Sequence, residues 1–268
     1  MRDLNHLSEI FHNYDTFVID LWGVMHNGIS LNSKAVEVIE KLSENSKKIV
    51  FLSNAPRPSS KVIEFLKKLK MDEKFLSKVI TSGEAAMYAI NQNKFGKKFY
   101  HLGPPRDQSL FEKVLNNKTS LDSCDYIICT GFFDDHEENL DYYKNLLKDH
   151  TSKKLMCTNP DLVVHKGDIE ELCAGSIAKT FENLGGKVIY YGKPYAKIYE
   201  MCFNLDEKVL AIGDNLRTDI KGANNLNIDS LFIYNGIHKN EVKNYKEISQ
   251  LLKRYNVQAT YFQKELKW

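Results

Sequence analysis

The sequence has few of the features that identify a protein by composition alone. Its five cysteines are an odd number, and no two of them have Cys-x-x-Cys spacing. A disulfide framework and a zinc site are therefore unsupported, and we expect reduced thiols. No apolar run approaches the ~20 residues that span a bilayer. Because Asp3 and Glu9 also interrupt the N-terminus, it is unlike a signal peptide, and we expect a cytoplasmic protein without a membrane partner.

An excess of charge of one sign is also absent. The chain has 37 basic and 35 acidic residues among 268, for a net charge of +2. The basic residues are scattered and are not interleaved with aromatic ones, so no nucleic-acid partner is expected. No Walker-type or dinucleotide-binding glycine motif is present.

The most informative stretch is Phe17-Val18-Ile19-Asp20-Leu21-Trp22-Gly23-Val24. Its β-branched and aromatic run predicts a buried strand that ends in a carboxylate. Open α/β sheets place their chemistry at the carboxyl ends of parallel strands, so Asp20 could be a nucleophile or a metal ligand. It could equally cap the following turn, and this stretch alone leaves both interpretations open.

Strand and helix patterns alternate along the whole chain, which predicts a parallel sheet wrapped by helices. The expected strands follow that at residues 17–20: 48–52, 79–82, 98–102, 126–130, 154–158, 188–191, 209–212 and 230–234. The expected helices cover 4–11, 33–42, 60–69, 84–92, 109–115, 140–147, 175–184, 196–203, 219–225 and 248–255. We interpret residues 83–187 as a second α/β unit inserted into a core of residues 1–82 and 188–268.

Polar side chains follow several core strands at the point where each strand ends. These residues are Asp20, Ser53, Asn54, Lys193, Asp214 and Asp219. The ends of parallel strands lie along one edge of a sheet, so we expect the side chains to gather there. Carboxylates suit Mg²⁺, whereas a hydroxyl, an amide and an ammonium can hold phosphate oxygens. The set indicates phosphoryl transfer.

The order of these motifs resembles the haloacid dehalogenase-like superfamily, subclass IIA, which contains nitrophenylphosphatases and sugar-phosphate phosphatases. Asp20-Leu21-Trp22-Gly23-Val24 is similar to its first motif, Leu52-Ser53-Asn54 to its second and Gly192-Lys193-Pro194 to its third. Residues 213–219, Gly-Asp-Asn-Leu-Arg-Thr-Asp, are similar to the fourth. Thr158-Asn159-Pro160-Asp161 and Cys173-Ala174-Gly175-Ser176 resemble the signatures of its cap.

The resemblance implies a doubly wound, Rossmann-like core with a smaller inserted C2-type α/β cap. It implies that Asp20 is the nucleophile and that Ser53, Asn54 and Lys193 bind the phosphoryl group. Mg²⁺ would be held by Asp20, the backbone carbonyl of Trp22 and Asp214, with Asp219 acting through water or through Lys193. The cap would contribute Asn159, Asp161 and His165 to substrate binding, and Trp22 could also stack on the substrate. The resemblance also allows a homodimer.

One position departs from the pattern of the resembled family. Its phosphatases have a second aspartate two residues after the nucleophile, which protonates the leaving oxygen, and this chain has Trp22 there. An indole has no usable proton near neutral pH, and losing a general acid typically costs ~10²–10⁴-fold in rate. The chain is then a slow phosphatase, or His26 or His165 replaces the acid, or it binds a phosphorylated ligand without turnover.

We therefore expect a Mg²⁺-dependent hydrolase of a small phosphomonoester, such as a sugar phosphate or a nucleotide, that forms an aspartyl-phosphate on Asp20. The alternative from another class is a weakly active or inactive regulatory protein that binds a phosphorylated metabolite.

Overall fold

The computed structural model describes residues 1–136, 139–204, 206–242 and 245–268. A seven-stranded parallel sheet forms the core, in the order β1-β13-β12-β11-β2-β3-β4. Its strands are β1 (Arg2–Asp3), β2 (Thr16–Ile19), β3 (Lys48–Ser53), β4 (Val79–Thr81), β11 (Val209–Gly213), β12 (Asp229–Ile233) and β13 (Tyr261–Gln263). The expected doubly wound α/β fold is confirmed.

The central strands are apolar on both faces because helices cover both sides of the sheet. Phe17 and Ile19 of β2 pack in one cluster with α1 and α2, whereas Val18 between them packs on the opposite face with Ile198 and Tyr199. The helices of the described chain are α1 (Ser33–Glu44), α2 (Ser59–Lys68), α3 (Ser82–Asn91), α4 (Leu140–Leu147), α5 (Ala174–Asn183), α6 (Ala196–Tyr199), α7 (Lys221–Leu226) and α8 (Tyr245–Tyr255).

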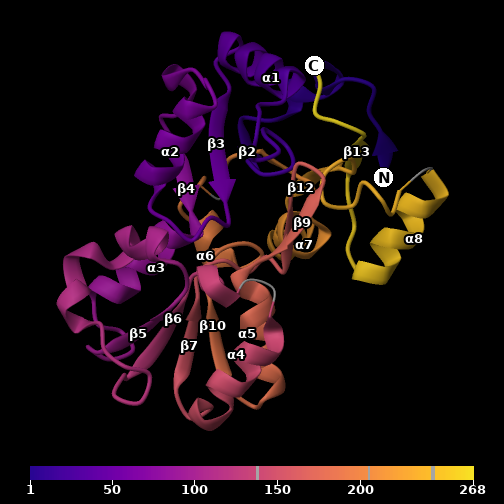
Figure 1. Ribbon diagram of the computed structural model, residues 1–268. Helices are drawn as coiled ribbons and strands as arrows, with labels where there is room; N and C mark the ends of the chain where they lie inside the picture. Colours follow the sequence, from indigo (N-terminus) through magenta and orange to yellow (C-terminus); the bar gives the residue numbers. More distant parts are fainter. Residues whose placement is uncertain (137–138, 205, 243–244) are drawn as a thin grey trace.

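The inserted unit has a smaller parallel sheet of its own, in the order β10-β7-β6-β5 (Figure 1). Its strands are β5 (Phe99–Leu102), β6 (Tyr126–Cys129), β7 (Lys154–Cys157) and β10 (Lys187–Tyr190). Helices α4 and α5 bury Tyr143, Ile177 and Phe181 against one face of this sheet. All five cysteines of the chain are buried and unpaired.

The position of β10 corrects one expectation. The strand at 188–191 was expected to belong to the core sheet. Instead, β10 pairs with β7 of the cap, with Val188 opposite Leu155 and Ile189 opposite Met156. Hydrophobic alternation predicts a strand without indicating which sheet receives it. The chain re-enters the core only after β10, where Gly192 and Lys193 follow, so the core segment expected at 188–268 begins later. The other domain limits stay predictions.

Three further elements differ from expectation. Residues 4–11 form two short 3₁₀ turns, Leu7–Glu9 and Phe11–Asn13, in place of one helix. The helix expected at 109–115 is an irregular 3₁₀ segment, Pro105–Asn117, with Phe111 out of helical geometry. The ring of Phe111 packs on Phe99 and His101 of the cap sheet, and this tertiary contact overrides the helical spacing.

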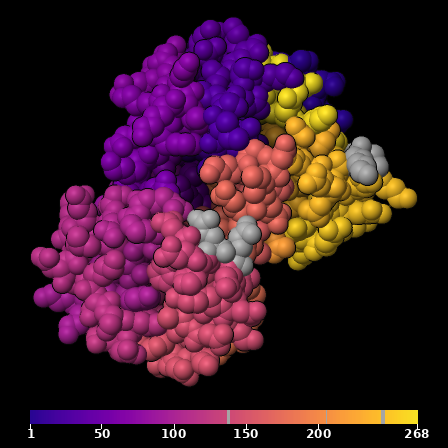
Figure 2. Space-filling view, in the orientation of Figure 1, coloured from indigo at the N-terminus to yellow at the C-terminus, as the bar shows by residue number. Residues whose placement is uncertain are grey.

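The third element is a hairpin that the sequence analysis missed. Strands β8 (Val163–Lys166) and β9 (Ile169–Leu172) pair antiparallel with each other and with no other strand of the described chain. The hairpin leaves the cap and projects toward the core (Figure 1). In Figure 2 its salmon-coloured surface reaches the orange and yellow surface of the C-terminal segment. The hairpin therefore bridges the two units.

Among the described residues, no helix has the length and apolar character required to cross a bilayer.

We expect Phe181→Ala to destabilise the cap by about 3–5 kcal/mol, because the ring is fully buried between α5 and the cap sheet and its loss leaves a cavity. Tyr88→Ala is the control, because Tyr88 is 74% exposed and its truncation should change stability by less than about 0.5 kcal/mol. Urea unfolding followed by circular dichroism measures both, and equal losses would contradict the assigned cap core.

Candidate active site

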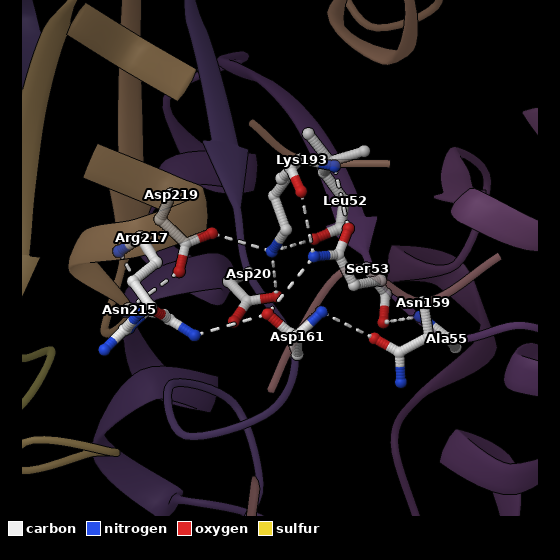
Figure 3. A network of polar contacts seen from close by, with 11 residues as sticks. Asp20, Leu52, Ser53, Ala55, Asn159, Asp161, Lys193, Asn215, Arg217 and Asp219 are labelled. Carbon is white, nitrogen blue, oxygen red and sulfur yellow. Dashed lines mark hydrogen bonds and ion pairs between the residues drawn. The ribbon is translucent and has the colours of Figure 1, made fainter. Parts of the chain in front are cut away.

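The ends of the central strands bring the predicted polar side chains together, as the parallel sheet requires. Strand β2 lies between β11 and β3, so Asp20 lies between the segment that carries Asp214 and the segment that carries Ser53. Lys193 enters from the connection after β10. Figure 3 shows Asp20, Ser53, Lys193 and Asp219 converging, with Asp161 reaching them from the cap. The gathering of the core motifs at one sheet edge is therefore observed.

The ammonium of Lys193 is the centre of the polar network. Its Nζ donates to Asp20 Oδ1 at 2.6 Å and to the carbonyl oxygen of Leu52 at 3.1 Å, and lies 2.7 Å from Asp219 Oδ1. These three interactions account for the three hydrogens of the ammonium. Burial alone would lower the pKa of Lys193, but Asp20 and Asp219 raise it well above its ordinary value. Lys193 is therefore a permanent buried cation.

Asp214 lies in a cradle of backbone. A Cβ atom on Gly23 or on Gly236 would lie 1.9 Å from Asp214 Oδ2, so each glycine leaves room for this carboxylate. Gly23 also has a φ of +83°, a conformation that favours glycine. The backbone N–H of Ile237 donates to Asp214 Oδ2 at 2.6 Å. A residue with a side chain at position 23 would therefore collide with Asp214, which explains why the first motif has a glycine there.

The carboxylates of Asp20, Asp214 and Asp219 form a cluster with ligand oxygens within 4.8 Å of one another. Burial, together with the charge of Asp219, raises the pKa of Asp20 above its ordinary range, and burial with the charge of Asp20 does the same for Asp214. A single lysine thus leaves the cluster with excess negative charge. A hard divalent cation would neutralise that charge and prefers such oxygen ligands, so the donor set fits one.

The two polar residues of the second motif, Ser53 and Asn54, lie beside Lys193. Asn54 Oδ1 accepts from the backbone N–H of Lys193 at 2.8 Å, and Asn54 Nδ2 donates to the carbonyl oxygen of Lys193 at 3.2 Å. Ser53 is buried at the end of β3, where its Oγ accepts from the N–H of Ala55 at 3.2 Å. Asn54 therefore positions the lysine, and Ser53 faces the cavity beside it.

From the cap, Asp161 reaches the same site. Its Oδ1 accepts from Asn54 Nδ2 and from Asn215 Nδ2, each at 3.2 Å, so it links the second and fourth motifs (Figure 3). Asn159 Oδ1 accepts from the N–H of Asp161 at 3.1 Å and shapes this turn. Burial raises the pKa of Asp161 to about 6, against the opposing effect of Lys193. A cap carboxyl therefore lies among the core motifs.

The three other positions singled out from the sequence have different surroundings. His26 is buried beside Trp22 and Phe65, and its Nδ1 accepts from the N–H of Gly28 at 3.1 Å. Burial lowers the pKa of His26 to about 4, so this imidazole is neutral and orders its loop. His165 Nε2 lies 3.5 Å from Glu170 Oε2, and its buried Nδ1 has no hydrogen-bond partner. The indole of Trp22 donates to the backbone carbonyl of His165 at 2.9 Å.

A cavity of about 520 Å³ opens over these groups. Its floor is the strand-end cluster, and its walls come from the loop at 22–32, the cap turn at 159–161, the hairpin and the loop at 235–239. Arg57 lines it as well and pairs with Asp107 at 2.6 Å. Of the hairpin wall, only His165 was expected from the sequence; the hairpin itself and the contributions of Ile237 and Lys239 were not, because no local motif marks them.

Comparisons with known proteins show which family the chain resembles. A family model described as haloacid dehalogenase-like hydrolase matches residues 17–115, and a second, HAD-hydrolase-like, matches residues 190–258. An acid sugar phosphatase of Staphylococcus haemolyticus is 26% identical over 263 residues, covering 95% of this chain and 94% of that protein. A 5'-nucleotidase of Bacillus subtilis is 23% identical and covers 85% of this chain and 90% of its own.

Solved structures share the whole architecture. A haloacid dehalogenase-like hydrolase from Brucella suis superimposes with a TM-score of 0.86 at 25% identity, covering 98% of this chain and 99% of that one. The p-nitrophenyl phosphatase of Archaeoglobus fulgidus shares the fold with a TM-score of 0.72 at 19% identity, covering 94% and 96%.

We expect Asp214→Asn to abolish stabilisation by a divalent cation without weakening the protein in chelator. The substitution removes one negative charge from the cluster, so the cation-free protein should be as stable as the parent or more stable. The parent should gain about 2.7 kcal/mol at a cation concentration one hundred times the dissociation constant. Thermal unfolding with EDTA and with Mg²⁺ measures this, and equal gains for both proteins would remove Asp214 from the cation site.

Proposed function

The chain belongs to the haloacid dehalogenase-like hydrolases, with the core and cap of subclass IIA, and we propose that it hydrolyses a small phosphomonoester through a phosphorylated Asp20. The observation that carries the proposal is the buried ion pair between Asp20 and Lys193, beside two further carboxylates and at the floor of a cavity. This set provides a nucleophile and a fixed positive charge at one point.

In the proposed reaction, a carboxylate oxygen of Asp20 forms a bond to phosphorus as the bond to the leaving oxygen breaks. Ser53 holds a phosphoryl oxygen and Lys193 supplies positive charge beside it, while Asp219 and Asn54 hold Lys193 in place. Water then attacks the phosphorus and gives a proton to the carboxylate that protonated the leaving oxygen; phosphate is released, and both carboxyl groups return to their starting states. Positioning and charge neutralisation account for most of the rate enhancement in such a transfer.

We propose Mg²⁺ as the cofactor, held by Asp20, by Asp214 and by the backbone carbonyl of Trp22, with Asp219 beside it. When bound, the ion would cancel the repulsion between the Asp20 carboxylate and a phosphate dianion. The excess negative charge of the cluster and the glycine cradle of Asp214 support this assignment.

The proton for the leaving oxygen needs another donor than residue 22, because Trp22 has no titratable group. His26 is a poor candidate, since its ring is neutral and Nδ1 already accepts a hydrogen bond. We propose Asp161, because this cap carboxyl contacts Asn54 and Asn215 on either side of the nucleophile and interacts electrostatically with Asp20. The second carboxyl oxygen can carry the proton while Oδ1 accepts from the two amides.

The substrate class follows from the size of the cavity and from the relatives. A cavity of about 520 Å³ suits a small metabolite such as a sugar phosphate or a nucleotide. The relatives named acid sugar phosphatase and 5'-nucleotidase are consistent with both choices. The second candidate function, binding of a phosphorylated ligand without turnover, rests on Trp22 in place of the usual acid.

We expect Asp20→Asn to abolish the release of phosphate from p-nitrophenyl phosphate and from a panel of sugar phosphates and nucleotides, because an amide cannot attack phosphorus. Asp122→Asn is the matched control: its side chain is 88% exposed in the cap, and the variant should keep the parent rate. Tight binding of one ligand without turnover by the parent would favour the second candidate function.

Asp161→Asn should lower kcat/KM by an amount that depends on the leaving group of the substrate. An alkyl phosphate needs a proton on the departing oxygen, so its kcat/KM should fall about 10²-fold or more, as is typical when a general acid is lost. p-Nitrophenolate leaves without protonation, and its kcat/KM should fall less than about tenfold. Parallel assays of both substrates measure the ratio, and equal losses would show that Asp161 only positions its neighbours.

A further inference from the structure

By resemblance of the first motif, Trp22 stands where the family's phosphatases have a second aspartate, and its side chain contacts the cap. Its indole N–H donates to the backbone carbonyl of His165 at 2.9 Å, within β8 and close to the turn of the β8–β9 hairpin. The backbone of Trp22 lies two residues from Asp20, so one residue contacts both the floor of the site and the projecting part of the cap.

The hairpin depends on contacts at its tip. Its strands pair only with each other among the described residues, and both are half-buried or exposed along their length. At the tip, the N–H of Gly167 donates to the carbonyl of Asn27 at 3.0 Å. Lys239 Nζ donates to Asp168 Oδ1 at 2.8 Å and to the carbonyl of Gly167 at 3.3 Å. With Trp22, three core residues thus hold the tip.

The loop after β2 fixes the indole in the orientation that this contact needs. A Cβ on Gly28 would lie 2.7 Å from Trp22 Cζ2 and 2.8 Å from Cη2, so the ring packs directly on the glycine backbone. Gly28 has a φ of +85°, and its N–H donates to His26 Nδ1. The ring of His26 meets the indole edge to face at 5.1 Å between centroids. Because the indole is held by its own loop, its N–H is preorganised for the hairpin.

The hairpin is also a wall of the catalytic cavity. Val163, Val164, His165, Gly167 and Asp168 line the same space as Asp20 and Ser53. A hairpin released from the core would leave that wall open, whereas a fastened hairpin encloses the part of the substrate beyond the phosphoryl group.

We propose that Trp22 is a positioning and specificity-determining residue, whose indole fastens the β8–β9 hairpin and so fixes the pocket wall that meets the leaving group. The part concerning specificity rests on the proposed phosphatase function, whereas the fastening itself does not. In place of an aspartate that would donate a proton, residue 22 is thus a tryptophan that holds a wall of the pocket in position. A fixed wall limits the room beyond the phosphoryl group, and so favours phosphate esters of small molecules over those of peptides or polynucleotides.

Hydrogen exchange tests the fastening independently of activity. Trp22→Phe keeps an aromatic ring and the backbone carbonyl but removes the N–H donor. Loss of one such hydrogen bond should lower the protection of the hairpin amides, that of Gly167 included, about threefold to tenfold. The amides of β2 and β11 should keep their protection. Trp268→Phe is the matched control, because Trp268 is the other of the two tryptophans and packs on Phe11, away from the hairpin.

A second variant tests the same contact in case Trp22→Phe does not fold. In a Trp268→Phe background Trp22 is the single tryptophan, so its fluorescence reports on the hairpin. Lys239→Met removes the ion pair with Asp168 at the turn of the hairpin. It should raise the quenching of Trp22 fluorescence by acrylamide severalfold. Unchanged quenching here, or unchanged hairpin exchange in Trp22→Phe, would overturn the proposed fastening.

Kinetics test the specificity. Trp22→Phe should raise KM for a small sugar phosphate about threefold to tenfold, with a smaller effect on kcat, and should narrow the preference for it over a phosphopeptide. An unchanged KM and preference would overturn the specificity role. A parent protein without phosphatase activity, but with Trp22-dependent hairpin protection, would refute the proposed function and leave the fastening in place.

Discussion

The buried ammonium of Lys193 is the interaction on which the site depends. It holds Asp20 and Asp219 at hydrogen-bonding distance, and its backbone is in turn held by both ends of the Asn54 side chain. Buried charges are costly unless they are paired, so this arrangement is stable only as a unit. One cation among three carboxylates still leaves negative charge. The same excess that is unfavourable for folding supports the proposed binding of a divalent cation.

The cap reaches this charged floor in two ways. Asp161 enters between the second and fourth motifs, and the β8–β9 hairpin lies against the loop that follows Asp20. The first contact brings a carboxyl to the strand-end cluster, and the second forms a wall of the cavity. In our proposal, Trp22 holds the hairpin wall of the cavity in position, and Asp161 supplies the proton for the leaving oxygen.

The sequence predicted the core of the site because parallel strands impose their own geometry. Ser53 ends β3 and Asp214 follows β11, the strands on either side of β2, so both lie at the sheet edge that carries Asp20. The contacts of Trp22 were not predictable, since its hydrogen-bond partner lies 143 residues away on a hairpin without a distinctive motif. The placement of β10 failed for a related reason: local periodicity defines a strand but not the sheet that it joins.

The central claim, a phosphorylated Asp20, is most directly tested by trapping the enzyme during turnover. The enzyme is quenched in acid while it hydrolyses a substrate, treated with borohydride to reduce any acyl phosphate, and digested for mass spectrometry. The account predicts that the reduced product forms at Asp20 and requires both substrate and Mg²⁺. Phosphate release at the full rate with no modification at Asp20, or modification of another residue, would contradict it.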